Sequence, residues 1–357
     1  AALRSARERR QPLDLDLPER KIILDDDGKV SSVNFTERLD AHRLIEECMV
    51  LANVAAAETL IAKQTPQLFR VHEEPPVDKL ESLRETASSA GLMLAKGQVL
   101  QTRHLNKLLH DAAGTDDAEL INMSTLRSMT QAYYSPKNFG HFGLALTNYA
   151  HFTSPIRRYS DLIVHRGLVS AHGWGDDGLS PIDLETLEDT SKHISDTERR
   201  SMMAERDTTD RYLAAFLSDR IGAEFTGKIS GIAKFGVFVR LDETRADGLV
   251  PISTLGNEYF NFDHDAGTLR GSDSGRIISL GLKARVRLVE AAPITGGIAF
   301  ELIELEDDEM EVSRGGRQRN GFGRGKRKSG PNPRRKATKA KAKSAKTKRK
   351  VTRQRKS

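Results

Sequence analysis

Two adjacent arginines, Arg157 and Arg158, are the residues whose type and position most clearly suggest chemistry. The preceding Thr153-Ser154-Pro155 is typical of a helix start, because a hydroxyl caps the free N–H groups and proline suits the first helical position. The sequence therefore predicts a helix from Pro155 to about Ser170 with both arginines in its first turn. Cations there oppose the helix dipole at a cost of about 0.3–1 kcal/mol each. Their presence favours a bound anion, such as a phosphate, at that helix end.

An ion pair is the alternative explanation for these arginines. Asp161 lies four residues after Arg157 and three after Arg158, so a helix would bring its carboxylate within reach of either guanidinium. The two explanations are compatible, since such a pair could orient an arginine toward a phosphate. His165, one turn beyond Asp161, could act as a proton shuttle, although a lone helical histidine is more often a packed or solvent-facing residue.

Several elements must position this segment. Leu13–Leu24 and Val30–Val33 are predicted to form a hairpin around the turn Asp25–Gly28, where the adjacent aspartates are expected to face water rather than to bind a metal. Leu39–Lys63 is predicted to be an amphipathic helix. Its apolar side contains Leu44, Ile45, Cys48, Met49 and Leu51. Other predicted helices cover Asp78–Ser89, Asn122–Tyr133 and Leu184–Ile221, and Phe139–Phe152 is expected to be irregular.

The pattern changes from helical to β at Gly222. Four alternating segments, Glu224–Leu241, Gly248–Leu255, Leu280–Glu290 and Ile298–Glu304, together predict five short strands in about eighty residues, which is typical of a small barrel of the OB type. The predicted fold class is therefore α+β. Phe235 and Phe238 could stack on nucleobases, provided that a bulge at Gly236 places both rings on one face; otherwise one of them belongs to the core.

Charge is distributed very unevenly along the chain. Residues 313–357 contain 20 of the 56 Lys and Arg residues and no Asp or Glu, so 36 cations remain against 50 anions in residues 1–312. Such a tail is predicted to be disordered. It is either a solubilising appendage or a tether for a polyanion, and the acidic body makes nucleic acid the favoured partner. A single cysteine suggests the reducing cytoplasm, and the lack of a long apolar run argues against a membrane span.

Taken together, residues 141–166 resemble the signature of the RNB exoribonucleases, the RNase II/RNase R family. The resemblance is carried by His141-Phe142-Gly143, Tyr149, Thr153-Ser154-Pro155, Arg157-Arg158-Tyr159, Asp161 and His165. It extends from about Leu13 to Glu304, includes Leu39–Leu60, Arg70–His72 and Met203–Asp207, and is nearest to the carboxyl-terminal portion of the bacterial RNase R branch. The barrel resembles an S1-type RNA-binding domain.

The resemblance implies processive 3′→5′ hydrolysis of single-stranded RNA to nucleoside 5′-monophosphates. It implies that Arg157 contacts the reacting phosphate and that Glu205 lies at the active-site end of the RNA channel. It also implies that Glu46 helps to select ribose. The alternatives are surface ion pairs of Glu205 with Arg206 and of Glu46 with Arg43. The full set expected to contact RNA is Glu46, Ser154, Arg158, Tyr159, Lys228, Lys234, Phe235, Phe238 and Arg240.

By resemblance, hydrolysis also requires Mg²⁺ held by spaced aspartates, and no comparable cluster occurs in this sequence, so no metal ligands are predicted here. We therefore expect a carboxyl-terminal fragment of such an enzyme that is inactive alone, with a non-catalytic RNA-binding remnant as the alternative. The expected domains are an RNB portion (1–221), an S1-type barrel (222–305) and a linker with the basic tail (306–357). Expected partners are single-stranded RNA and, through the tail, structured RNA or the ribosome. The chain is expected to be monomeric and cytoplasmic.

Overall fold

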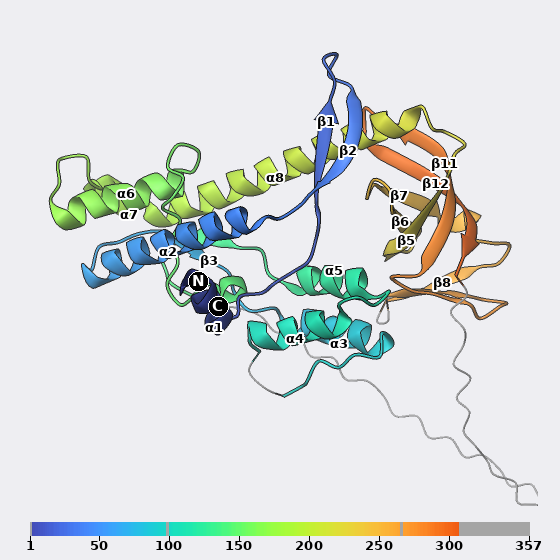
Figure 1. The fold of residues 1–357 in the computed structure, drawn as a ribbon, viewed down its shortest axis with the longest axis horizontal. Helices are drawn as coiled ribbons and strands as arrows, with labels where there is room; N and C mark the ends of the chain where they lie inside the picture. Colours follow the sequence, from blue (N-terminus) through green and yellow to red (C-terminus); the bar gives the residue numbers. More distant parts are fainter. Residues whose placement is uncertain (1, 98–99, 265–266, 307–357) are drawn as a thin grey trace, which may run out of the picture. The chain divides into compact units, whose positions relative to one another are not determined.

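A computed structural model describes residues 2–97, 100–264 and 267–306. Helices dominate the described residues up to 218, and strands dominate those from 219 to 306 (Figure 1). The α+β fold class is confirmed. The helices are α1 (Ala2–Arg10), α2 (Asp40–Ala62), α3 (Val77–Ser89), α4 (Thr102–Ala112), α5 (Ala118–Ser128), α6 (Tyr159–His172), α7 (Pro181–Glu185) and α8 (Leu187–Ser218). Strands β1 (Glu19–Leu24) and β2 (Val30–Thr36) form a hairpin, and β3 (Phe69–Val71) pairs with β4 (Tyr133–Ser135).

The predicted hairpin is confirmed, but its first strand is shorter than expected. The Asp25 carboxylate accepts hydrogen bonds from the backbone N–H groups of Asp27 (3.1 Å) and Lys29 (2.8 Å), so it closes the turn. Residues before Glu19 do not join β1, because their backbone groups bond elsewhere. The Leu13 N–H donates to the Gly143 carbonyl (2.8 Å), and the Asp16 N–H donates to Asn122 Oδ1 (2.8 Å).

Helix α2 forms where it was predicted, but the predicted apolar side is not the buried side. Leu44, Ile45 and Leu51 are 55%, 59% and 56% exposed. The buried residues of α2 are instead Glu47, Val50, Asn53, Ala56, Ala57 and Leu60. Polar contacts and small side chains decide this orientation: arginines of α1 bind Glu47, and the two alanines let α6 pack closely.

The remaining helices agree with the sequence in part. The predicted helix to Tyr133 ends at Ser128, because residues 133–135 pair with β3 instead. Helix α4 was not predicted, although Leu105, Leu108 and Leu109 make its buried face. Helix α8 accounts for most of the predicted helical stretch and reaches from contacts with α6 and α7 to contacts with β11 and β12 (Figure 1).

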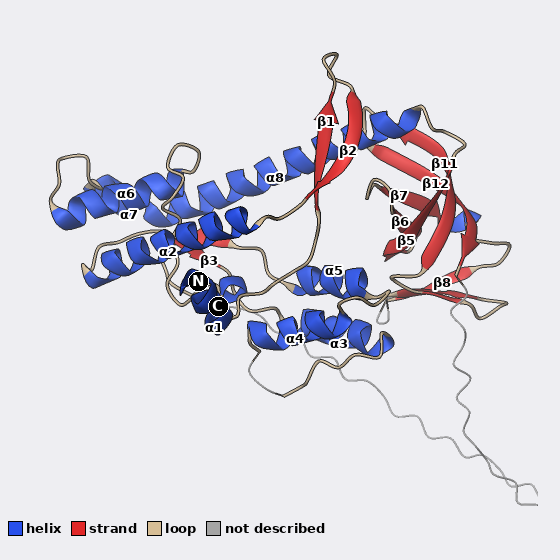
Figure 2. Ribbon diagram, viewed as in Figure 1, coloured by secondary structure: helices blue, strands red, loops and turns tan. Residues whose placement is uncertain are grey.

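The predicted five-stranded barrel is confirmed (Figure 2). Its closed order is β11-β12-β7-β6-β5, with bounds Lys283–Ala292, Gly297–Leu305, Asp247–Pro251, Gly236–Leu241 and Glu224–Ala233. The interior is apolar and includes Val239, Val286 and Phe300. A Cβ on Gly248 would come within 2.2 Å of the Phe300 ring, so this position requires glycine. A second sheet of order β10-β9-β8, with bounds Ile277–Ile278, Thr268–Gly271 and Phe260–Asp263, was not predicted.

The barrel is fastened to the helical part by polar contacts. Lys283 forms an ion pair with Asp116 (2.8 Å), and the Arg20 guanidinium donates to the Arg245 carbonyl (2.9 Å). Arg245 also pairs with Glu119. The described residues therefore belong to one compact unit. The predicted basic tail, Ser313–Ser357, lies outside the described residues. None of the described helices is long and apolar enough to span a membrane.

Candidate functional site

Two buried side chains hold the backbone of the loop Phe152–Arg158 in place. Asn53 Oδ1, on α2, accepts hydrogen bonds from the backbone N–H groups of Phe152 (2.9 Å) and Thr153 (3.2 Å). Asp161 Oδ1, on α6, accepts from the N–H of Ser154 (2.8 Å). Asn53 is 3% exposed and Asp161 is 0% exposed. Three consecutive N–H groups are thus fixed by buried acceptors, so the loop backbone has little freedom to move.

The predicted helix start is wrong by four residues. Residues 155–157 form a turn in which the N–H groups of Arg157 and Arg158 approach the Ser154 carbonyl at 3.3 and 3.1 Å, and α6 begins at Tyr159. The Asp161 carboxylate bonds the Ser154 N–H, which holds the chain in this turn before the helix starts. Both arginines therefore precede the first turn of α6 rather than lie within it.

The two arginines have different surroundings. Arg158 is 18% exposed and forms an ion pair with Asp161 (2.7 Å), as one of the sequence alternatives predicted. Arg157 is exposed, and its guanidinium makes no hydrogen bond or ion pair in the described part of the chain. No side chain caps the N-terminus of α6. An unpaired guanidinium two residues before a helix end without a side-chain cap is an arrangement suited to binding an anion.

His165 is packed against Phe152 of this loop. One of its ring nitrogens lies 2.9 Å from the Phe152 carbonyl, and its ring stacks on Phe152 with 4.3 Å between the centroids. This packed position agrees with the alternative that the sequence favoured.

A chain of buried and half-buried rings lies beside the loop, and the sequence did not predict it. His72, His141, Tyr149, His151 and Tyr134 follow one another with centroid separations of 5.0, 5.2, 5.7 and 5.7 Å. Burial lowers the pKa of His141 to about 3 and that of His151 to about 2, and the positive charges of Arg158 and Arg70 act in the same direction on His151. The histidines are therefore neutral at physiological pH.

Hydrogen bonds fix the individual rings of this cluster. His72 Nδ1 accepts from the Gly143 N–H (2.9 Å), and its Nε2 therefore donates to the Thr130 carbonyl (2.9 Å). A Cβ on Gly143 would lie 2.9 Å from His72 Nδ1, so the approach requires glycine. Asn53 Nδ2 donates to the Tyr149 hydroxyl (3.0 Å), which joins the ring cluster to the residue that holds the loop.

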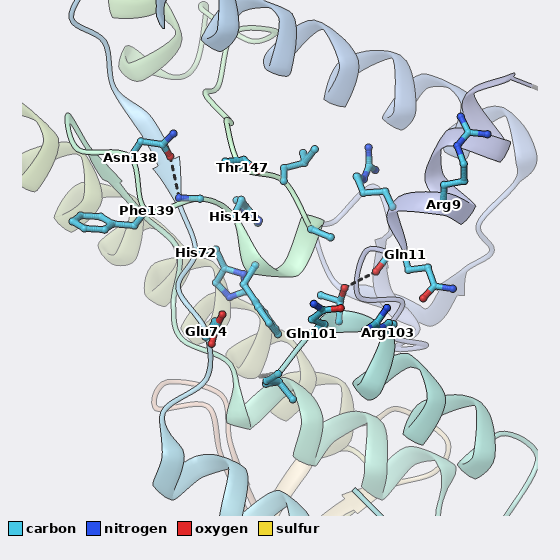
Figure 3. Close-up of a pocket in the computed structure, with 17 residues that line it drawn as sticks. Arg9, Gln11, His72, Glu74, Gln101, Arg103, Asn138, Phe139, His141 and Thr147 are labelled. Atoms are coloured by element: carbon cyan, nitrogen blue, oxygen red, sulfur yellow. Dashed lines mark hydrogen bonds between the residues drawn. The ribbon is translucent and has the colours of Figure 1, made fainter. Parts of the chain in front are cut away.

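An open groove of about 660 Å³ adjoins the ring cluster (Figure 3). His72 and His141 form part of its wall, and Arg9, Arg103 and the exposed residue Phe139 also line it. This groove was not predicted from the sequence, because its walls come from segments far apart in the chain.

The two glutamates singled out from the sequence lie on different elements. Glu46 pairs with Arg7 (3.5 Å) and with Arg38, not with Arg43. Glu205 is exposed on α8, where it lines a groove of about 520 Å³ with Arg20, Ile22 and Leu24 of β1. We find no pair between Glu205 and Arg206 among the described residues. Arg157 is not among the residues that line the Glu205 groove.

Of the barrel residues expected to contact RNA, some are accessible and others are already bound to groups of this chain. Phe235 is 58% exposed, and its ring meets the half-exposed Phe238 ring edge-on at 6.1 Å. The expected bulge exists, but it lies in β5 between Ile229 and Gly231, opposite Phe238, rather than at Gly236. Lys234 is exposed beside the aromatic pair. In contrast, Lys228 donates to the Asp116 carbonyl (2.7 Å), and Arg240 binds both carboxylate oxygens of Asp247.

Across residues 2–97, 100–264 and 267–306, no group of three or more His, Cys, Asp or Glu side chains is placed to hold a metal ion. The described residues therefore do not fit a resident Mg²⁺.

Two parts of the chain match known domain families. The RNB domain model matches residues 1–172, and the S1 RNA binding domain model matches residues 218–302. Ribonuclease R of Escherichia coli (strain K12) is 38% identical over 336 residues, which are 92% of this chain but 41% of that protein. The chain thus spans less than half the length of this relative.

Solved structures of RNase R are also similar to this chain. RNase R of Mycoplasma genitalium, solved in its apo form and in complex with ribose methylated single-stranded RNA, matches with a TM-score of 0.79 and 30% identity in both cases. The match covers 84% of this chain and 48% of that chain. Yeast Ssd1 shares the fold at a TM-score of 0.53 and 22% identity, over 65% of this chain and 29% of its own. The chain belongs to the RNB family, and its barrel is an S1 RNA-binding domain.

Proposed function

We propose that this chain binds the 3′-terminal region of single-stranded RNA at the loop Ser154–Arg158 and forms the phosphate-binding part of a 3′→5′ exoribonuclease. The observation that supports it most is the exposed Arg157 guanidinium, which lies beside the uncapped N-terminus of α6 on a backbone fixed by Asn53 and Asp161. A guanidinium without an intramolecular partner can bind a phosphate without first breaking an ion pair, and the fixed backbone restricts the region that it can reach.

Each residue of the loop has a distinct proposed role. Arg157 contacts the reacting phosphate, while Arg158 is held by Asp161 and maintains the loop conformation rather than binding freely. Ser154 and Tyr159 flank Arg157 and are placed to contact the adjacent sugar-phosphate backbone. Glu46 and Glu205 are proposed, through the family resemblance alone, to contact the ribose and to lie at the active-site end of the RNA path.

The barrel is proposed to bind RNA upstream of the 3′ end. Phe235 and Phe238 present an accessible aromatic pair for base stacking, and Lys234 supplies a charge for the backbone. Lys228 and Arg240 are engaged with Asp116 and Asp247, so their contribution to RNA binding is expected to be smaller. The complex of Mycoplasma genitalium RNase R with single-stranded RNA supports this class of ligand.

The chain alone is proposed to bind RNA with little or no hydrolysis. The family is expected to use Mg²⁺, and the described residues contain no group of ligands for it. The products of the complete enzyme would be nucleoside 5′-monophosphates. A non-catalytic RNA-binding protein built on the same two domains is the second candidate, and the same observation favours it. We expect either protein to be monomeric and cytoplasmic.

Two measurements on RNA test the proposal. The full chain is incubated with a uniformly labelled single-stranded oligoribonucleotide and Mg²⁺, and binding and mononucleotide release are followed together. We expect binding without release. Robust release of mononucleotides would contradict the proposed inactivity, and no detectable binding would contradict the RNA-binding role itself.

A further inference from the structure

An unpaired arginine lies where helix α5 meets the barrel. Arg127 is exposed in the last turn of α5, and within the described part of the chain its guanidinium makes no hydrogen bond or ion pair. Together with Lys228 of β5 and Arg240 of β6, it lines a narrow crevice between α5 and the barrel (Figure 1). The helix dipole favours a cation in a last turn, so the position of Arg127 alone does not indicate a ligand.

The second cation at this junction, Arg240, is already bound to a carboxylate. Its guanidinium donates to both oxygens of Asp247 at 2.9 to 3.2 Å, and the Ser230 hydroxyl donates to the same carboxylate (2.6 Å). Partial desolvation lowers the pKa of Arg127, the positive charge of Arg240 acts in the same direction, and Asp247 opposes both. Two guanidiniums therefore share the charge of one carboxylate, and only Arg240 is hydrogen-bonded to it.

The other charges around the crevice do not neutralise Arg127. Its carboxylate is already paired with Arg245, and its lysine donates to a neutral group, the Asp116 carbonyl (2.7 Å). Three cations thus line the crevice against one carboxylate, and the charged lining residues are Glu119, Arg127, Lys228 and Arg240. An external anion at the exposed Arg127 guanidinium would offset the repulsion between these cations.

The outward face of the barrel connects this junction with the aromatic pair. Phe238 and Arg240 are two residues apart on β6, so their side chains lie on the same side of the sheet, about 7 Å from each other. A base that stacks on Phe238 therefore has its neighbouring phosphate within reach of Arg240 and Arg127. The crevice itself measures about 30 Å³, which suits a water molecule, so the phosphate would lie at its mouth.

We propose that Arg127 and Arg240 together bind one backbone phosphate of single-stranded RNA where α5 meets the barrel, and that Asp247 competes with this phosphate. Arg127 belongs to the region that matches the RNB domain and Arg240 to the region that matches the S1 domain, so one phosphate is held by both. Because Arg240 must loosen its contact with Asp247 to bind the phosphate, Asp247 weakens RNA binding. The proposal rests on the proposed RNA binding of the chain.

Substitutions of Arg127 test the cationic half of the proposal. The complete chain is titrated with a fluorescent single-stranded oligouridylate in EDTA at several salt concentrations. Arg127→Gln should raise the Kd about tenfold and reduce the slope of log affinity against log salt by about 0.7. Arg127→Lys keeps the charge and should retain most of the affinity. Lys192→Gln, on a 64% exposed side chain of α8, removes the same charge and should change the Kd less than about twofold. An Arg127→Gln effect no larger than this control would overturn the proposal.

Removing the competing carboxylate tests the other half. Asp247→Asn should tighten RNA binding by at least about threefold, because the phosphate no longer displaces an anion from Arg240. Asp242→Asn removes a charge from another exposed residue of the barrel and is the matched control. A folded Asp247→Asn variant that binds RNA no more tightly than this control would overturn the competition with Asp247.

Urea unfolding of the same variants separates RNA binding from a structural role. Arg127 makes no bond within the described residues, so Arg127→Gln should unfold at the same urea concentration as the unchanged chain. A clearly lower midpoint would show that Arg127 supports the fold, and would overturn the proposal. Failure of the unchanged chain to bind RNA would contradict the proposed function, whereas RNA binding that is insensitive to Arg127→Gln would contradict this inference alone.

Discussion

Replacing Asp161 by alanine should destabilise the chain severely, because this buried carboxylate on α6 binds several groups of the loop Phe152–Arg158. It is 0% exposed and accepts hydrogen bonds from the Ser154 N–H (2.8 Å), the Arg158 guanidinium (2.7 Å) and the Ser160 hydroxyl (3.0 Å). Removing one partner of a buried ion pair leaves an uncompensated charge, at a cost of about 3–5 kcal/mol. The unpaired Ser154 N–H adds to this cost.

The measurement is urea unfolding followed by fluorescence of the single tryptophan, Trp174, which directly follows the C-cap of α6 and so reports on this part of the chain. With a urea dependence of about 1–3 kcal/mol/M, the midpoint should fall by at least about 1 M. Asp189→Ala, on an 87% exposed side chain of α8, is the matched control and should change stability by less than about 0.5 kcal/mol. The double variant Asp161→Ala/Arg158→Met should recover part of the loss, since no charge is left unpaired. An Asp161→Ala midpoint equal to that of the control would refute this account of the loop.

Four further predictions follow from the site. In a full-length enzyme carrying this chain, Arg157→Ala should lower turnover by at least about 100-fold while leaving RNA affinity largely intact, and an equal loss of affinity in a binding titration would make it a ground-state contact. Phe235→Ala should weaken binding of single-stranded RNA by about 1–3 kcal/mol without changing the unfolding midpoint of the barrel; unchanged affinity would remove this ring from the RNA path. The folded-state pKa values of His141 (about 3) and His151 (about 2) lie below the ordinary value of 6.5, so their contribution to stability is complete above pH 6.5 and is lost as the pH falls toward these values. The free energy of unfolding should therefore be about 1 kcal/mol lower per histidine at pH 5.5 than at pH 7.5, and His141→Gln should reduce this pH dependence. A free energy of unfolding that does not change with pH would show that these histidines are not held neutral in the folded state. Deleting Ser313–Ser357 should weaken RNA binding and flatten its salt dependence, and an unchanged slope would show that the tail does not contact RNA.

Local sequence signals predicted the fold well wherever neighbouring residues decide the structure. Alternation and glycine placement predicted the barrel strands, and the Asp/Gly turn predicted the β1–β2 hairpin. The predicted start of α6 was wrong. Ser154 looked like a helix cap, but residues 155–157 form a separate turn and α6 begins at Tyr159.

The candidate site was only partly accessible from the sequence. The arginine pair could be found because its charge conflicts with the expected helix dipole. Asn53 could not be recognised as a loop-positioning residue, because its partners lie 99 and 100 residues away and an asparagine within an apolar helix has no local signature. The ring cluster was missed for the same reason. His72, which follows β3, and His141 lie far apart in the sequence and are brought together by an isolated β-bridge.

The direction in which α2 faces shows a further limit. Periodicity correctly identified the apolar residues Leu44, Ile45 and Leu51, but it could not tell which of two faces this chain buries. The buried face contains Glu47, whose charge is compensated by Arg7 and Arg10 from a different helix. Compensation of this kind depends on tertiary contacts and leaves no pattern in the helix itself.

The central claim is that the RNA 3′ end lies at the loop Ser154–Arg158, and crosslinking tests it most directly. A single-stranded oligoribonucleotide with 4-thiouridine at its 3′-terminal nucleotide is bound to the full chain and irradiated, and the modified peptide is identified by mass spectrometry. We predict crosslinks within residues 149–166, and with the photoreactive base moved several nucleotides upstream, crosslinks near Phe235 and Phe238. Crosslinks of the 3′-terminal base confined to the barrel would contradict the claim.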